Sequence, residues 1–479
     1  MKHRTLASEP EFALGWRAVW RLWTANLSPA IAWGVSVALF AMLLLFGANK
    51  LALYDNLPEA RARLTEAFAQ ADLTDANYAH GNSIIGSHQY NDCLILGMAV
   101  DQPSGLRHEL SISPLIPGIS RPSSAEGAPD YDAPCLALHK LVRGDGDVVS
   151  TTYYHRYLHG QVVLTRLLLP SLGVAGMRAI YKSLLSLLLL GGLSIALMRL
   201  AQRRSTVYVG FVIAFVCFAR LFGLGEFGQS LGHAPSDMLL VVYLLFACVS
   251  AETGPSTKTM LAAAAAFGAL TMILELLTGG LPLGVAMIVG TSAMMLPRTA
   301  SAQLPIKAML GSLTAFLAAA ITCVVCKLAA SVAVFGSSVL YDYGRQLETR
   351  MALRKVDNLP TSPALFVQKL VGGLSSLAEY SHVLVAGTIL IAIIAGIWGL
   401  RSVRRSSPWP ADRVRATLLA LSTLPIALWF PLFWQHTIQH AWFMDRILVW
   451  IIVAGFWLFS EGLAVTAPRL KQGPSKNPS

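Results

Sequence analysis

The chain contains a series of apolar runs of roughly twenty residues, the length that a helix needs to cross the hydrocarbon core of a membrane. About ten such runs are recognisable, with ends uncertain by about four residues. They lie near 29–48, 180–199, 206–223, 237–252, 259–277, 280–297, 307–327, 382–400, 414–433 and 447–465. Because lipid offers no hydrogen-bond partner to backbone groups, runs of this length are expected to fold as helices. The sequence therefore predicts an all-α, polytopic membrane bundle.

Composition agrees with this class. Of the 479 residues, 54% are hydrophobic and only 13% are charged. A soluble domain carries about 25% charged residues, so lipid is expected to cover much of this surface. The net charge of +11 would also suit nucleic acid, but the basic residues flank the apolar runs, as Arg199, Arg203 and Arg204 do. This is the positive-inside pattern, so we expect the bilayer as a partner and no nucleic acid.

The basic loops also predict orientation and domain limits. They all fall on one side of the predicted spans, which places both termini in the cytoplasm of a bacterial-type cell with the chain in its inner membrane. We expect a cytoplasmic amphipathic segment at 1–28, a membrane domain at 29–465 and a cytoplasmic tail at 466–479. The first span lacks a cleavage site and is expected to be retained. The long segments 49–179 and 340–381 are then periplasmic.

The first periplasmic segment is expected to have structure of its own. A charged helix is predicted near 59–68, and 161–178 is predicted to be a helix at the membrane interface. Cys93 and Cys135 both lie here, where an oxidising compartment permits a disulfide; two unpaired cysteines remain the alternative. The pair Cys323-x-x-Cys326 falls within an apolar run and is interpreted as two small buried hydrophobes.

Asp92 precedes a short apolar run, Leu94 to Val100. From local sequence it has two interpretations. Asp is a good helix N-cap, so Asp92 is expected at the start of a helix. Alternatively, a carboxylate held above the membrane can take a proton from an acceptor hydroxyl.

A dense group of aromatic and basic residues follows in the segment Tyr153 to Gly160, which includes His155, Arg156 and His159. Arginine binds phosphate, and aromatic side chains favour the membrane interface, so the segment is suited to a phosphorylated lipid head group. An aromatic belt without a ligand is the alternative.

Isolated ionisable residues near the ends of spans are further candidates, because such groups are rare at membrane depth without a reason. Glu275 is either a structural group or part of an external cavity. Lys327 has the same two interpretations, or it simply extends to the interface. Glu226, His233 and Asp237 surround another turn on the same side.

The last candidate segment runs from Trp434 to Arg446. His436 and His440 are four residues apart and would share one face of a helix. That spacing suits a metal ion, but the glutamate of a zinc-protease motif is missing. With Arg446 nearby, phosphate binding is the other interpretation. We expect no cofactor, and dependence on a divalent metal stays open.

The motifs Asn91-Asp92, Tyr154 to Gly160, Leu274 to Thr278 and His436 to Arg446 together resemble a poorly characterised family of bacterial multi-spanning proteins, in the same order and at similar spacing over most of the chain. That family is in turn similar to the GT-C glycosyltransferases, among them arabinofuranosyltransferases that use a polyprenyl-phosphate sugar. This chain departs from the pattern, with leucine for tryptophan at Leu158, glutamate for aspartate at Glu275, glutamine and threonine for asparagine and serine at 435 and 437, and aspartate for tyrosine at Asp445.

The resemblance implies a GT-C-like membrane enzyme with interfacial helices. It would transfer a sugar, such as the pentofuranose arabinofuranose, from a polyprenyl-phosphate donor to a periplasmic glycan, lipid or protein acceptor. Asp92 would be the general base. The implied substrate-binding residues are His155, Arg156, His159, Glu275, Lys327, His436, His440 and Arg446. Two alternatives remain: a transporter or flippase of a lipid-linked or anionic solute, and a non-catalytic partner in envelope assembly.

Overall fold

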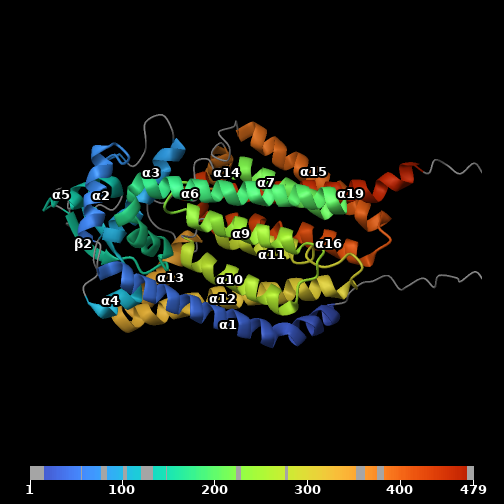
Figure 1. The fold of residues 1–479 in the computed structure, drawn as a ribbon, viewed down its shortest axis with the longest axis horizontal. Coiled ribbons are helices and arrows are strands. Elements are labelled where there is room, and N and C mark those ends of the chain that lie inside the picture. The colour runs from blue at the N-terminus through green and yellow to red at the C-terminus, as the bar shows by residue number, and fades with distance from the viewer. Residues whose placement is uncertain are drawn as a thin grey trace, which may run out of the picture.

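The computed structural model consists of long helices that lie along one axis, with shorter elements gathered at one end (Figure 1). It describes residues 16–54, 57–76, 83–100, 105–119, 133–146, 148–222, 228–275, 279–351, 362–374 and 382–471. Glu226, a candidate from the sequence, lies outside the described residues.

Within the described part of the chain, 7 helical segments are long and apolar enough to cross a membrane. They are formed by α1 (Trp16–Tyr54), α6 (Gly160–Arg203), α10 (Thr257–Leu274), α12 (Gln303–Phe335), α15 (His382–Ser406), α16 (Pro410–Leu421) with α17 (Leu424–Leu432), and α19 (Val449–Lys471). Three of the predicted spans fall on shorter apolar helices, α7 (Thr206–Leu221), α9 (Ala234–Ser250) and α11 (Gly280–Thr291). The predicted helical membrane class is borne out, and the count of about ten spans stays a prediction.

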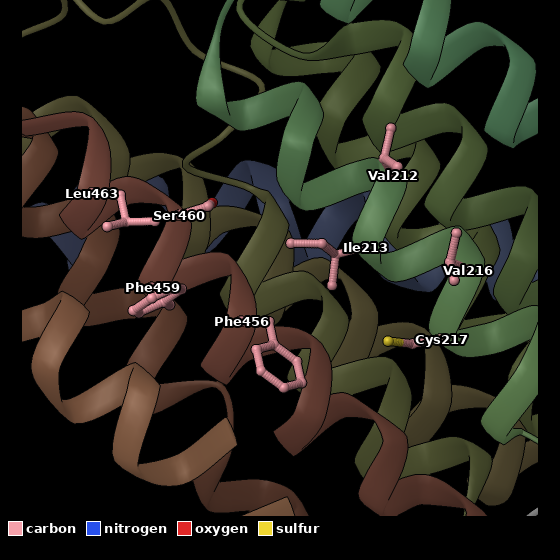
Figure 2. A pocket seen from close by; sticks show the side chains of 8 residues that line it. All are labelled: Val212, Ile213, Val216, Cys217, Phe456, Phe459, Ser460 and Leu463. Carbon is pink, nitrogen blue, oxygen red and sulfur yellow. The ribbon is translucent and has the colours of Figure 1, made fainter. Parts of the chain in front are cut away.

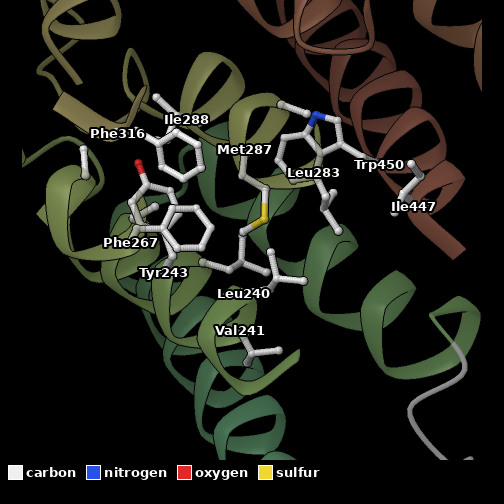
Figure 3. Close-up of a cluster of buried hydrophobic side chains, with 14 of the residues drawn as sticks. Leu240, Val241, Tyr243, Phe267, Leu283, Met287, Ile288, Phe316, Ile447 and Trp450 are labelled. Atoms are coloured by element: carbon white, nitrogen blue, oxygen red, sulfur yellow. The ribbon is translucent and has the colours of Figure 1, made fainter. Parts of the chain in front are cut away.

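Apolar side chains cover both the interior and the periphery of this bundle. Leu43 on α1, Leu187 on α6 and Ile391 on α15 are exposed, as expected for side chains that face lipid. Inside, α9, α10 and α12 meet through aromatic rings: Tyr243 stacks on Phe267 at 4.3 Å between ring centres (Figure 3). Such contacts add to the dispersion energy that holds membrane helices together.

Glycine determines how closely α15 approaches α19. A Cβ atom added at Gly396 would lie 2.9 Å from the Cα of Gly455, and one at Gly399 would lie 2.1 Å from the carbonyl oxygen of Leu458. Close backbone packing at small residues is the usual way in which membrane helices associate. This close packing fixes the position of α19, and the candidate site described below lies near the N-terminal end of that helix.

The shorter elements between α1 and α6 form a layer at one end of the bundle, here called the capped end (Figure 1). They are α2 (Leu57–Ala69), α3 (Ser83–Val100), α4 (Leu106–Ser111), β1 (Leu115–Ile119), α5 (Pro134–Arg143) and β2 (Val148–Tyr153). The helix predicted near 59–68 corresponds to α2. The two strands pair antiparallel, with Ile116 opposite Thr152. The beginning of α1 and the end of α19 both lie at the opposite end.

A buried arginine attaches this layer to the bundle. Arg166 of α6 donates to the carbonyl oxygens of Met98 and Ala99 at 2.8 and 3.0 Å, and to the side-chain oxygen of Asn49 at 2.7 Å. The two carbonyls belong to the last turn of α3, where helix geometry leaves them without an intrahelical partner. Arg166 therefore supplies hydrogen-bond donors to carbonyl groups at the end of α3, and it joins α1, α3 and α6.

Cys93 and Cys135 form a disulfide that joins α3 to α5, with 4.9 Å between their Cα atoms. Of the two alternatives that the sequence leaves open, the paired one is correct. Both cysteines are fully buried in the apolar core of the capped end. The bond closes a long loop within a layer that has a small core of its own.

Replacing Cys93 and Cys135 together with serine is expected to lower the stability of the capped end. For a sequence separation of 42 residues, removal of the cross-link releases about 2–4 kcal/mol of unfolded-state entropy. The check is thermal unfolding of the double variant in detergent, with wild type in the presence and absence of reductant as the reference. Reductant should shift the wild type towards the variant and leave the variant unchanged. An unshifted midpoint in the double variant would contradict the expectation.

The predicted interfacial helix is the first part of α6 rather than a separate element. The helix is kinked at Gly173, whose φ of 63° is a left-handed conformation that glycine adopts without strain. Near the kink, Arg63 of α2 donates to the carbonyl oxygen of Pro170 at 3.2 Å. The segment before the kink lies under the capped layer, and the segment after it continues into the membrane-spanning part.

The remaining elements at the capped end come from the second half of the chain. They are α13 (Ser338–Arg350), α14 (Pro363–Gly373), α18 (Trp434–Met444) and the 3₁₀ turn η2 (Asp445–Leu448). Phe366 of α14 stacks on Trp434 of α18 at 4.0 Å between ring centres. Tyr343 of α13 donates to the carbonyl of His155, so the segments 49–179 and 340–381 come together at one end.

Candidate functional site

Asp92 lies in the interior of α3, several turns after its first residue, so the interpretation as a helix N-cap is wrong. Its side chain is 1% exposed. Oδ2 accepts from Nη2 and Nε of Arg178 at 2.8 and 3.0 Å. Oδ1 accepts from the hydroxyl of Ser230 at 2.9 Å and from the backbone N–H of Leu231 at 2.8 Å. Four donors therefore surround one carboxylate.

This geometry gives Asp92 a clear structural role. Each carboxylate oxygen has two acceptor positions, and all four are occupied. The bonds join α3 to α6 through Arg178 and to the turn before α9 through Ser230. Of the donors, only the Ser230 hydroxyl can rotate away without moving backbone or separating the ion pair. An acceptor hydroxyl can reach the carboxylate if it takes the place of Ser230.

A second buried ion pair lies close by. Nη1 of Arg446 donates to Oδ2 of Asp237 at 2.8 Å, and the two residues are 2% and 0% exposed. The Arg446 guanidinium also lies 4.6 Å from the ring centre of Phe222. The sequence analysis connects Arg446 with a phosphate group, whereas the structure shows that it neutralises an internal carboxylate.

His233 connects the two ion pairs. Its Nε2 lies 3.1 Å from the side-chain nitrogen of Asn91, next to Asp92, and its Nδ1 lies 3.5 Å from Nη2 of Arg446. The resulting set, here called the buried polar network, consists of Asn91, Asp92, Arg178, Ser230, His233, Asp237 and Arg446. The sequence predicts His233 and Asp237 only as residues around a turn on the same side, and it does not single out Arg178.

Glu275 adjoins this network from the end of α10. Its Oε1 accepts from the backbone N–H of Gly280 at 3.0 Å, which stabilises the turn into α11. Glu275 is 6% exposed and close enough to Asp237 to interact with it electrostatically. The side-chain amide of Gln161, at the start of α6, donates to the carbonyl of Leu274. Glu275 therefore contributes negative charge to the edge of the network.

Lys327 is buried in α12 and bonded to the end of α4. Its ammonium group donates to the carbonyl oxygens of Ser111 and Ile112, both at 2.7 Å, and to the hydroxyl of Ser113 at 2.9 Å. An ammonium group has three protons, and all three are used here. The sequence suggested anion binding or extension to the interface; the structure shows a tie between α12 and the capped layer.

The segment from Tyr154 to His159 forms a second cluster with α13 and α18. Arg156 lies over the ring of Tyr154 at 5.4 Å, and the hydroxyl of Tyr343 donates to the carbonyl of His155. Arg350 is close enough to Tyr154 and to His440 to interact electrostatically with both. The name "aromatic–cationic cluster" is used below for Tyr154, His155, Arg156, Tyr157, His159, Tyr343, Arg350 and His440.

The histidines of this cluster are neutral at neutral pH. Burial, with a smaller effect of nearby Lys327, lowers the pKa of His155 to about 4. Burial and the charge of Arg350 lower the pKa of His440 to about 4, and burial holds the pKa of His159 well below its usual value. The positive charge of the cluster therefore comes from its arginines.

Lowering the pH is expected to destabilise the protein through His440. An unfolded histidine has a pKa near 6.5, whereas His440 in the folded protein has a pKa of about 4. The unfolded state therefore binds the extra proton, and this contribution to stability is lost as the pH falls from about 6.5 to 4. With allowance for residual solvent exposure we expect roughly 2 kcal/mol.

The check compares the unfolding midpoints of wild type and His440→Gln at pH 7.5 and pH 4.5. The pH-dependent decrease should be smaller in the variant, whatever its midpoint at pH 7.5. Equal decreases in the two proteins would show that His440 titrates normally.

The rings of His436 and His440 lie close together in α18, with 4.6 Å between their centres, although the helix is kinked at His440, whose φ of −130° and ψ of 20° are not helical. Among the described residues, however, no group of three or more His, Cys, Asp or Glu side chains is placed to hold a metal ion. Two histidines alone are a weak site for a divalent metal, which usually takes at least three protein ligands. The geometry therefore favours polar contacts of these two histidines over the binding of a metal ion.

One pocket of about 370 Å³ lies away from both clusters, between α7 and α19 (Figure 2). It is lined by Val212, Ile213, Val216, Cys217, Phe456, Phe459, Ser460 and Leu463. Its lining is apolar apart from Cys217 and Ser460. The pocket contains no group suited to acid–base or phosphate chemistry.

The fold and the two clusters define a multi-pass helical membrane protein with polar and cationic residues gathered at one end. The chain matches no family model, no curated protein and no solved structure. Its function must therefore be inferred from the two clusters themselves.

Proposed function

We propose that this protein is a GT-C-like glycosyltransferase of the bacterial inner membrane. It transfers a sugar from a polyprenyl-phosphate donor to a periplasmic glycan, lipid or protein acceptor. The observation that carries the proposal is that the buried polar network and the aromatic–cationic cluster adjoin at the capped end, where the ring of Phe443 lies 5.7 Å from that of His233 and 5.2 Å from that of His440. A carboxylate and arginine side chains suited to binding phosphate lie at one end of the bundle, which supports a reaction of this kind.

In the proposed reaction, the acceptor hydroxyl displaces the Ser230 hydroxyl from Oδ1 of Asp92. Asp92 takes the hydroxyl proton while the acceptor oxygen attacks the anomeric carbon of the donor sugar. The bond between that carbon and the phosphate oxygen breaks, and polyprenyl phosphate leaves with the additional negative charge. Arginine side chains stabilise this charge in a site with little water.

The proposed orientation follows from charge. The capped end lies in the periplasm and both termini lie in the cytoplasm, because the loops at the opposite end contain the excess of lysine and arginine. A disulfide in the capped layer agrees with an oxidising compartment on that side.

The contacts at the opposite end of the bundle give less support to the alternative function, transport. Arg298 forms ion pairs with Glu252 at 3.1 Å and with Glu461 at 3.4 Å, and it donates to the hydroxyl of Thr206. These contacts connect the ends of α7, α9 and α19. A transport cycle that opened a path between these helices would have to break this set of contacts.

The test uses protein reconstituted in nanodiscs with synthetic polyprenyl-phosphate sugars, arabinofuranose first, and a mixed panel of acceptors. Sugar transfer or donor hydrolysis by wild type would support the enzyme class, and its loss in an Asp92→Asn variant that keeps its fold would support Asp92 as the base. Equal turnover by both proteins would keep the class and remove Asp92 from the mechanism. Binding of polyprenyl phosphate without turnover of any donor would favour a flippase or an assembly partner.

A further inference from the structure

Arg350, at the last residue of α13, was not singled out by any sequence motif. It interacts electrostatically with Tyr154 from the segment before α6 and with His440 from α18. The same helix is in direct contact with the segment before α6, since the hydroxyl of Tyr343 donates to the carbonyl of His155. The Nη1 atom of Arg350 is buried and has no hydrogen-bond partner among the described residues. A buried arginine donor without a partner is unusual, since most buried polar atoms are bonded.

Two further nitrogen atoms of the same cluster lack a partner. Nδ1 of His155 and Nδ1 of His159 are both buried and unbonded within the described part of the chain. His159 itself is 0% exposed, and its Nε2 lies 2.8 Å from the carbonyl oxygen of Tyr154. A carbonyl oxygen only accepts, so Nε2 carries the proton and Nδ1 is left as an acceptor. The cluster thus offers both an unused donor and an unused acceptor.

The charge of the aromatic–cationic cluster indicates what kind of ligand can form hydrogen bonds with these unbonded nitrogen atoms. Arg156 and Arg350 are cationic, whereas the three histidines are neutral at neutral pH. Asp342, an acid that interacts electrostatically with His155, is already paired with Arg345 at 3.0 Å on the same helix. An anion is therefore favoured. Guanidinium groups match the oxygens of a phosphate in pairs, which makes phosphate the natural occupant.

We infer that Arg350 is a phosphate-binding residue and that, together with Arg156, it holds the phosphate of a lipid-linked ligand in the aromatic–cationic cluster. The acceptor Nδ1 of His159 is then available for a hydroxyl group of whatever the phosphate carries. This inference rests on the proposed function for the identity of the ligand. The two arginines that it uses differ from Arg446 and Lys327, whose charged groups are bound to internal partners.

The experiment measures binding of farnesyl phosphate to the full-length protein in nanodiscs of neutral lipid. Farnesol and inorganic phosphate are measured beside it, to separate the contributions of the chain and of the anion. Wild type should bind farnesyl phosphate well, inorganic phosphate more weakly and farnesol least. Arg350→Gln should weaken the binding of farnesyl phosphate by at least about tenfold, the effect of removing a hydrogen bond to a charged group.

A matched pair of substitutions provides the control. Arg350→Lys and Arg345→Lys both keep the charge on α13 but lose the planar guanidinium. At a site where phosphate is held by paired donors, lysine binds less well, so Arg350→Lys should lose several-fold in affinity. Arg345 is exposed and forms an ordinary surface ion pair, so Arg345→Lys should bind as wild type does. Equal affinity of wild type and both Arg350 variants would overturn the inference.

The outcomes also separate this inference from the proposed enzyme activity. Binding that depends on Arg350, without turnover of any polyprenyl-phosphate sugar, would support the phosphate site and reject the transferase. Turnover of a donor with unchanged kinetics in Arg350→Gln would support the transferase and reject the role of Arg350. Inorganic phosphate binding as tightly as farnesyl phosphate, with the same loss in Arg350→Gln, would keep the residue's role and reject a lipid-linked ligand.

Discussion

Replacing Arg446 with methionine is expected to lower the free energy of unfolding by about 3–5 kcal/mol, because it leaves the carboxylate of Asp237 buried and without its counter-charge. Asp237 is 0% exposed, and the distance between the paired atoms is 2.8 Å. Its other oxygen, Oδ1, has no hydrogen-bond partner among the described residues, so little remains to stabilise the negative charge. Thermal unfolding in detergent, followed by circular dichroism, measures the effect.

The double variant Arg446→Met/Asp237→Leu is the control. It replaces the ion pair with apolar side chains of similar size, which is often neutral or even stabilising. We expect it to recover most of the loss. A double variant that is stable and active would show that Arg446 has only a structural role. A double variant that is stable but no longer binds polyprenyl phosphate would show that Arg446 takes part in binding the phosphate. A single variant as stable as wild type would contradict the burial argument.

Substituting Asp92 with asparagine is expected to reduce sugar transfer by about 10²–10⁴-fold, the usual contribution of a general base. From the structure we also expect the Asp92→Asn variant to be less stable than wild type. An asparagine side chain has only one acceptor oxygen. If that oxygen stays with Ser230 and Leu231, the amide nitrogen faces the guanidinium of Arg178, donor against donor. Loss of activity in this variant is therefore ambiguous by itself.

A second variant separates the two effects. Asp92→Asn/Arg178→Gln removes both charges and lets two amides bond to each other, so stability should be largely restored. If Asp92 is the base, the double variant stays inactive although it is folded. If Asp92 only binds Arg178, activity should return together with the unfolding midpoint. Transfer rates and unfolding midpoints for wild type, both single variants and the double variant distinguish these outcomes.

Much of the architecture was predictable because it depends on local composition. Apolar runs near twenty residues long correspond to the long helices, and the charged segment near 59–68 corresponds to α2. The conformation of Gly173 was not predictable, although an interfacial helix was expected there. The disulfide remained one of two alternatives, since spacing in the sequence does not bring Cys93 and Cys135 together.

The candidate residues were predictable as a set, but their roles were not. Asp92, Arg446, Lys327 and Glu275 were all recognised from the low frequency of charge in apolar surroundings. In the structure, Lys327 and Arg446 hold internal partners, and Asp92 is interior to a helix rather than at its cap. Arg350 had no local signal at all, because nothing in its own helix indicates that Tyr154 and His440 lie beside it.

The sequence by itself therefore determined the membrane class, the positions of the long helices and the end of the bundle at which chemistry-bearing residues gather. These follow from hydrophobicity and charge, which act residue by residue. Only the tertiary structure decided which charges neutralise each other: Asp92 with Arg178 and Asp237 with Arg446 are 86 and 209 residues apart. The physical reason is that a buried charge is stabilised by whichever partner the packing of helices brings within about 3 Å, and that packing is set by shape across the whole bundle.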